Sequence, residues 1–188
     1  AKTSGTITYT SISDTASNLA ANTGSYVTGA VDVTITDGIT AAQLVTINAL
    51  TSGEITLNDT NDTLTDSTAD LVAAFTGTVT AYTGAITIND ANTTAITAAN
   101  LSTIGGETSG VVTVTNAIAI SGTQAEVTAA LVTTDTLVVA GSATVTISDA
   151  NTTAITAANL SAIGAKTSGA VTVTNAIAIS GTQAEVTA

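Results

Sequence analysis

The chain repeats itself, and this repetition limits its fold more than any other feature. Residues 87–129 return at residues 146–188 with 38 of 43 positions unchanged, so the period is 59 residues. A unit of this kind cannot bury its apolar side chains alone and must pack against its neighbours. We therefore expect a single continuous fragment over residues 1–188 that is built of stacked repeats.

Weaker matches extend the repeat toward the N-terminus. ITAAQLVTI at 39–47 and TSGEITLND at 51–59 match ITAANLSTI and TSGVVTVTN in the later copies. We divide the chain into a partial divergent copy, a divergent copy, a complete copy and a partial copy, at residues 1–32, 33–86, 87–145 and 146–188.

Two kinds of segment alternate inside each repeat. Around Ile88 and Val114, apolar residues alternate with Thr, which indicates half-buried strands. Between them lie Ala- and Leu-containing segments that suit one or two helical turns, and Thr123 and Glu126 have the spacing of a capping box. We predict a fold of the β class: a parallel β-solenoid (β-helix) with short helical or loop segments on one side and about two coils per 59-residue repeat.

Two other repeat architectures compete with the solenoid. A leucine-rich repeat also gives a strand and a helix in each coil, but the chain lacks its Leu-x-x-Leu-x-Leu spacing. A tandem β-sandwich needs about 100 residues and seven strands in each module. A 59-residue repeat is too short for such a module.

Composition excludes several functions. The chain has two Lys or Arg residues, 14 acidic residues and a net charge of -12. It therefore lacks the clustered positive charge that binding to nucleic-acid phosphates requires. It has no His and no Cys, which rules out most zinc sites and most nucleophile–base pairs. No apolar run approaches the roughly 20 residues of a membrane span. Because the remaining acids recur with the repeat, whereas a catalytic site would occur once, we expect no enzyme.

An Asp or Asn follows almost every principal strand. These residues are Asp14, Asp37, Asp59, Asp90, Asn116, Asp149 and Asn175. Stacked at one corner, about 4.8 Å apart, such carboxylates could bind calcium, which prefers oxygen ligands. The alternative is that the side chains cap the backbone at a sharp turn. Asn at alternate levels favours capping, because each Asn removes a charge that a metal site needs.

Calcium is the only cofactor that the acidic residues indicate. The cluster in the divergent copy is the best candidate for an ion site, although solvated surface acidity explains it better; it consists of Asp59, Asp62, Asp66 and Asp70. The full set of candidate calcium ligands is Asp59, Asp62, Asp66, Asp70, Asp14, Asp37, Asp90 and Asp149. We identify no catalytic or cofactor-binding residue.

Thr and Asn patterns suggest two further ligands. Thr-x-Thr pairs such as Thr113/Thr115 and Thr172/Thr174 would face outward on one sheet, where regular hydroxyls could order ice. High β-propensity explains the same pairs without a ligand. Six Asn-x-Ser/Thr sequons would permit glycosylation in a secreted protein, although a chain so rich in Thr produces them by accident.

Three segments carry a resemblance to a known class of protein. ISDTASNLAAN at 12–22, VTITDGITAAQL at 33–44 and ITAANLSTIG at 96–105 resemble segments of giant tandem-repeat proteins of bacterial cell surfaces, notably those of marine cyanobacteria. The resemblance implies an extracellular or cell-surface location and an adhesin, outer-layer or filament-forming role. Its partners would be neighbouring repeats of the same chain, or identical subunits in a fibre or surface layer.

The sequence thus leads to two functional hypotheses. The first is an extracellular structural repeat segment of a large cell-surface, adhesin or fibre-forming protein. The second is a module that binds calcium, ice or glycan.

Overall fold

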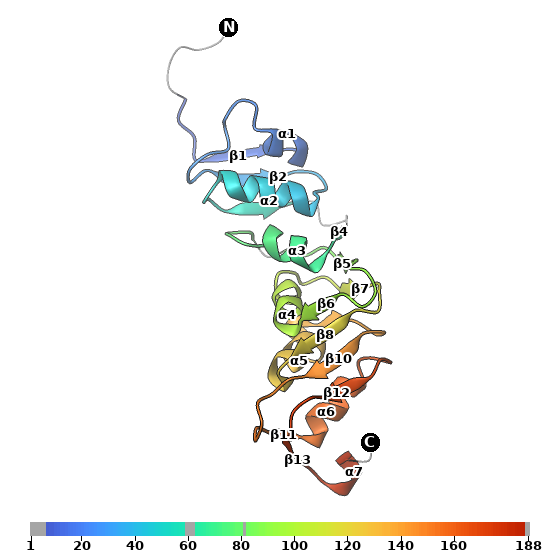
Figure 1. Ribbon diagram of the computed structural model, residues 1–188. Coiled ribbons are helices and arrows are strands. Elements are labelled where there is room, and N and C mark those ends of the chain that lie inside the picture. The colour runs from blue at the N-terminus through green and yellow to red at the C-terminus, as the bar shows by residue number, and fades with distance from the viewer. Residues whose placement is uncertain (1–6, 59–62, 81, 187–188) are drawn as a thin grey trace.

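The computed structural model describes residues 7–58, 63–80 and 82–186. Short strands recur through all three ranges and alternate with helices (Figure 1). The strands are β1 (Ser11–Asp14), β2 (Asp32–Ile35), β3 (Ile55–Leu57), β4 (Leu64–Asp66), β5 (Ile86–Ile88), β6 (Ala95–Thr97), β7 (Val112–Val114), β8 (Ala119–Gly122), β9 (Val138–Val139), β10 (Thr144–Ile147), β11 (Ala154–Thr156), β12 (Val171–Val173) and β13 (Ala178–Ser180).

Helices take up at least as many of the described residues as strands do. They are α1 (Ala16–Ala21), α2 (Ala41–Leu50), α3 (Thr68–Ala74), α4 (Ala98–Gly106), α5 (Gln124–Leu131), α6 (Ala157–Gly164) and α7 (Gln183–Val186), with a 3₁₀ helix η1 (Thr134–Thr136). Consecutive helices pack against one another from α1 to α7, so the strand–helix units follow each other from the N-terminus to the C-terminus (Figure 1).

All strand pairs between the named strands are parallel, and they form four sheets within the described ranges. The strand orders are β1-β2-β3, β4-β5-β7-β9, β12-β10-β8-β6 and β11-β13. Pairing joins equivalent positions of neighbouring units, as where Thr87 lies opposite Thr113 and Thr146 opposite Thr172. Parallel strands need a crossover between them, and here the crossovers contain the helices.

The predicted fold class is wrong: the protein is a mixed α/β protein with parallel sheets, and it is not a β-solenoid. The segments expected to be loops or single helical turns are helices of up to 10 residues, as in α2. The strands are only two to four residues long and are divided among four sheets. Periodicity located both kinds of segment but underestimated the helices, because short capped runs of Ala and Leu give only a weak signal.

Hydroxyl side chains begin the helices. Thr15, Thr40, Ser67, Thr97, Thr123 and Thr156 each accept a hydrogen bond from a backbone N–H three residues later. The predicted capping box of Thr123 and Glu126 is confirmed, because the Glu126 carboxylate also accepts from the Thr123 N–H at 2.7 Å. Each such N-cap stabilises its helix by about 1 kcal/mol, which helps helices this short to form.

The core lies between the sheets and the row of helices. In β2 the buried Val33 and Ile35 alternate with half-exposed Thr34, so the strands face the core with Val, Ile and Leu. The helices add fully buried Leu44, Leu71 and Leu101, among others. The buried residues form one cluster that runs from Ala16 to Ile163, so the core is continuous along the chain.

A Thr-Ser-Gly corner follows three of the helices and ties each unit to the one before it. The Thr108 hydroxyl donates to the carbonyl of Gly84 at 2.7 Å and accepts from the N–H of Gly110 at 2.9 Å. Thr51 and Thr167 make the same two kinds of bond. A Cβ at Gly110 would overlap the Gly84 carbonyl, so only Gly allows this close approach of two backbones.

Candidate functional site

The candidate site consists of the Asp and Asn side chains that follow the strands. Three of these Asp residues reach back to the helix of the preceding unit. Asp37 accepts from the backbone N–H of Ala16 at 2.7 Å, and Asp149 from that of Gln124 at 2.6 Å. Ala16 and Gln124 are the first residues of α1 and α5. These carboxylates therefore satisfy helix N-terminal donors and lie where the helix dipole favours negative charge.

Asp90 makes the strongest of these connections. Its Oδ2 atom accepts from both the N–H and the hydroxyl of Thr68, at 2.7 Å and 2.6 Å. Thr68 is the first residue of α3 and is only 3% exposed. Asp90 thus joins the end of β5 to the start of the helix in the unit before.

Asn116 and Asn175 donate hydrogen bonds, whereas the Asp residues accept them. The Asn116 side-chain amide donates to the backbone carbonyl of Asp90 at 2.7 Å, and Asn175 donates to that of Asp149 at 2.6 Å. A carboxylate has no hydrogen to donate, so Asp cannot make this bond. Asn therefore stands where the side chain must donate to a backbone carbonyl. Asp stands where the side chain must accept from a backbone N–H.

Asp14, Asp66 and Asp70 bond locally. The Asn18 amide and the Thr15 N–H both donate to Asp14 Oδ1, at 2.9 Å and 2.8 Å, and they lower the pKa of the Asp14 carboxyl, the Asn18 bond most of all. Asp66 accepts from the Ser67 N–H at 2.8 Å, and Asp70 accepts from the Ser67 hydroxyl at 2.6 Å. These three carboxylates belong to the N-terminal turns of α1 and α3.

The structure does not bring the predicted calcium ligands together where it describes them. The strands beside them belong to three sheets. Asp14 ends β1 and Asp37 follows β2 in the first sheet, Asp66 ends β4 and Asp90 follows β5 in the second, and Asp149 follows β10 in the third. Among the described residues there is no group of three or more metal-ligating side chains that could hold an ion. Asp59 and Asp62 lie outside the described residues, so the calcium site proposed for the divergent copy stays a prediction.

The outward Thr residues form ladders only one or two residues wide. The second Thr of two pairs is used by the fold, since the Thr115 hydroxyl donates to the Ile88 carbonyl at 3.3 Å and the Thr174 hydroxyl to that of Ile147 at 3.2 Å. In the register of β7 and β9, Thr113 lies opposite Val139, which interrupts the row. Ice binding stays a prediction that no contact of these residues favours.

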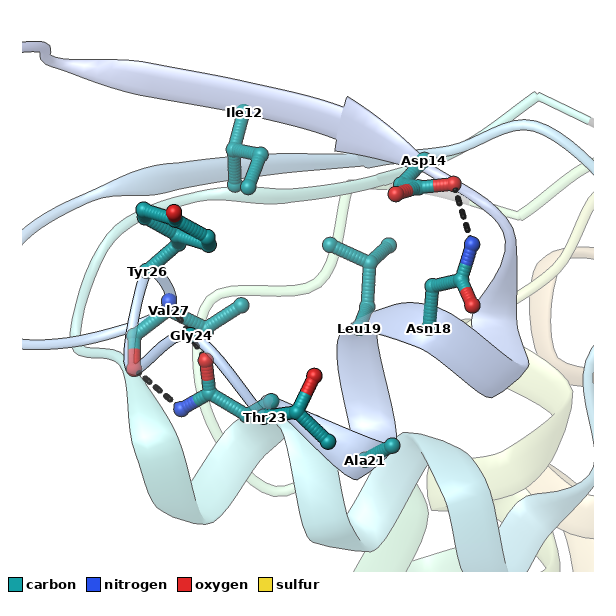
Figure 2. A pocket seen from close by; sticks show the side chains of 10 residues that line it. Ile12, Asp14, Asn18, Leu19, Ala21, Thr23, Gly24, Tyr26 and Val27 are labelled. Carbon is teal, nitrogen blue, oxygen red and sulfur yellow. Dashed lines mark hydrogen bonds between the residues drawn. The ribbon is translucent and has the colours of Figure 1, made fainter. Parts of the chain in front are cut away.

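A cavity of about 250 Å³ lies at the N-terminal end, between β1, α1 and the loop after it (Figure 2). The Asn22 side chain holds this loop closed, because its Oδ1 accepts from the Val27 N–H at 3.0 Å and its Nδ2 donates to the Val27 carbonyl at 2.9 Å. Tyr26 lines the cavity with its ring against Gly24, and the ring of Tyr9 meets it edge-on with 6.4 Å between the ring centroids. The polar side chains of Asn18 and Asn22 bond to the chain itself.

Comparisons with known proteins give no relative for this chain. No family model, no curated protein and no solved structure matches it. The resemblance to bacterial surface proteins therefore stays a prediction. The solenoid architecture that the repeat pattern predicted is wrong, and neither the α/β fold nor the comparisons support the expected adhesin or filament role.

In the described ranges, none of the helices has both the length and the apolar content needed to cross a membrane.

The inter-unit role of Asp37, Asp90 and Asp149 was missed by sequence reasoning, which placed these side chains at turns of their own segment. The Thr-Ser-Gly corner was missed as well, although its signal is present. The tripeptide occurs at residues 3–5, 51–53, 108–110 and 167–169, once for each of the four repeats. A Gly kept at one repeat position indicates a close backbone approach.

Proposed function

We propose that this chain is a non-catalytic structural repeat segment of a larger extracellular or cell-surface protein. The observation that supports the proposal is the recurrence of one inter-unit contact: Asp37, Asp90 and Asp149 each bond the first N–H of the helix one unit earlier. The Asp side chains that recur after β2, β5 and β10 are thus used to join the units. Its partners in this role are neighbouring repeats of the same chain.

The electrostatics and composition fit this role. The net charge of -12 comes from acids spread along the whole chain, which keeps a Thr-rich surface soluble and limits non-specific association. The location outside the cell rests on the resemblance of the repeat segments to bacterial surface proteins.

A repeat insertion tests the structural role. A second copy of residues 87–145 is inserted after residue 145, so that every junction reproduces one that the chain already has. Each repeat adds two strands to the stack, and neighbouring strands lie about 4.8 Å apart. We therefore expect the longest dimension in small-angle X-ray scattering to grow by about 10 Å. The free energy of unfolding should rise as well, since stacked repeats add interfaces. An insertion that leaves the longest dimension unchanged, or that unfolds the protein, contradicts the proposal.

The location is tested on intact cells that produce the protein. An antibody against this chain should bind unpermeabilised cells or recover the protein from the medium, and external protease should remove the cell-bound signal. A cytoplasmic marker serves as the control for cell integrity. Signal that appears only after permeabilisation contradicts the extracellular assignment.

A further inference from the structure

The two near-identical repeats bury the same residues to very different degrees. Ile120 in β8 is 1% exposed, whereas its equivalent Ile179 in β13 is 51% exposed. Val112 and Val114 of β7 are buried, whereas the equivalent Val171 and Val173 of β12 are half-buried. Since the side chains are the same, the difference comes from what covers them.

In the first of these copies the cover is residues 130–147, which we call the covering segment. Its strand β10 pairs with β8, where Val145 lies opposite Ile120. Its strand β9 pairs with β7, where Val138 lies opposite Val112. The apolar side chains that it places in the core are Ala130, Leu131, Val138, Ala140, Ala143, Val145 and Ile147, all of them buried.

The C-terminal copy presents the same surface without that cover among the described residues. In those ranges β13 pairs only with β11, and β12 pairs only with β10, so each has one edge without a strand partner. We call this surface, made by β12, β13 and Ile177 before β13, the C-terminal face. Its residues are identical to those that the first copy packs against the covering segment.

We propose that the C-terminal face is a docking surface for one specific partner, a segment with the sequence of the covering segment, ALVTTDTLVVAGSATVTI. This inference deepens the proposed function and rests on it. The partner supplies two parallel strand edges, and it supplies Val and Ile side chains that cover Ile179 as Val145 covers Ile120. Edge strands recruit a further strand through their unpaired backbone groups, and the alternate side chains give the specificity.

The test appends the covering segment after Ala188, where the new junction reproduces that of Ala129 and Ala130. Hydrogen exchange of residues 171–180 is followed by mass spectrometry in the original and the extended chain. We expect exchange to slow at least tenfold on extension. A control extension of equal length carries Val145→Asp and Ile147→Asp in the appended copy and should leave exchange unchanged. Equal exchange in the original and extended chains, with the appended segment open to protease, overturns the proposal.

A second measurement identifies the contact. Ile179→Thr should shift the unfolding midpoint little in the original chain and strongly in the extended chain, where Ile179 becomes covered as Ile120 is. Equal shifts in both chains overturn the proposal. So does a stable dimer of the original chain with residues 171–180 already protected, because the occupant is then a second copy. If the repeat insertion succeeds and this extension fails, the docking surface alone is wrong.

Discussion

The Asp90 carboxylate accepts hydrogen bonds from the backbone N–H and the hydroxyl of Thr68, a residue 22 positions earlier in the chain. The contact crosses from the end of one strand to the start of the helix in the preceding unit. Strand ends and helix starts of successive units are therefore held together by a side chain as well as by the sheets and the core.

Asp90→Ala should destabilise the protein by about 2 kcal/mol, because the backbone N–H and the hydroxyl of buried Thr68, at the start of α3, both lose their acceptor. Asp149→Ala should cost less, since Asp149 serves only the Gln124 N–H among the described contacts. Urea denaturation followed by circular dichroism measures both. Asp135→Ala, which removes an equal charge from an exposed position, is the control and should change the midpoint little. Equal effects of all three variants would show that charge, and not the inter-unit bond, matters.

Asn116→Asp tests why Asn alternates with Asp. The variant removes the amide donor to the Asp90 carbonyl and adds a carboxylate, so we expect a loss of about 1–2 kcal/mol at neutral pH. The matched variant Asn175→Asp breaks the equivalent bond to Asp149 at an exposed position and should cost less. Unchanged urea midpoints for Asn116→Asp would mean that the alternation has another cause.

Several parts of the structure follow from the sequence because they depend on local spacing. The alternation of Thr with Val or Ile around Ile88 and Val114 placed β5 and β7, and Thr123 with Glu126 placed the start of α5. The fold class did not follow. Whether a run such as residues 98–106 is a turn or a nine-residue helix depends on burial of Leu101 and Ile104 against the next unit, and that contact is tertiary.

The role of the acidic residues was harder to predict, for a related reason. In sequence, an Asp after a strand is compatible with a metal ligand, a turn cap or an inter-unit cap. The choice depends on which backbone N–H lies within reach, and for Asp149 that group belongs to Gln124, in the preceding unit. The Asn at position 116 gave the useful hint, since a calcium site would have favoured a carboxylate there, and in the structure its amide donates to the Asp90 carbonyl.

Calcium should leave the stability of the protein unchanged. The described carboxylates at Asp37, Asp90 and Asp149 bond to backbone N–H groups, and among the described residues no three metal-ligating side chains gather where they could hold an ion. Thermal unfolding in EDTA and in millimolar calcium measures the effect. A rise of the unfolding temperature with calcium would contradict this expectation, and loss of that rise in a variant with Asp59→Asn and Asp62→Asn would place the site in the divergent copy.

Glu107 should make stability depend on pH. Partial burial raises the pKa of its carboxyl above the ordinary value of 4.5. Between the ordinary and the raised pKa the folded chain binds more protons than the unfolded chain, so this group lowers stability as pH rises through that window. Glu107→Gln removes the effect. Its urea midpoint should equal that of the parent below the ordinary pKa and exceed it above the raised pKa. A constant difference at every pH would contradict this origin.

Gly110→Ala should be among the most damaging single-methyl additions in the chain. The new Cβ would overlap the Gly84 carbonyl, and backbone on both sides limits relaxation, so we expect a loss of roughly 2 kcal/mol or more. Gly106→Ala is the control: its Cβ would lie 3.8 Å from the nearest atom, a methyl of Thr136, and the second copy already has Ala165 there. Because Ala has a higher helix propensity than Gly, Gly106→Ala should be neutral or should stabilise the protein by up to about 1 kcal/mol. Urea midpoints that fall equally in both variants would show that the close approach of the Thr-Ser-Gly corner does not limit position 110.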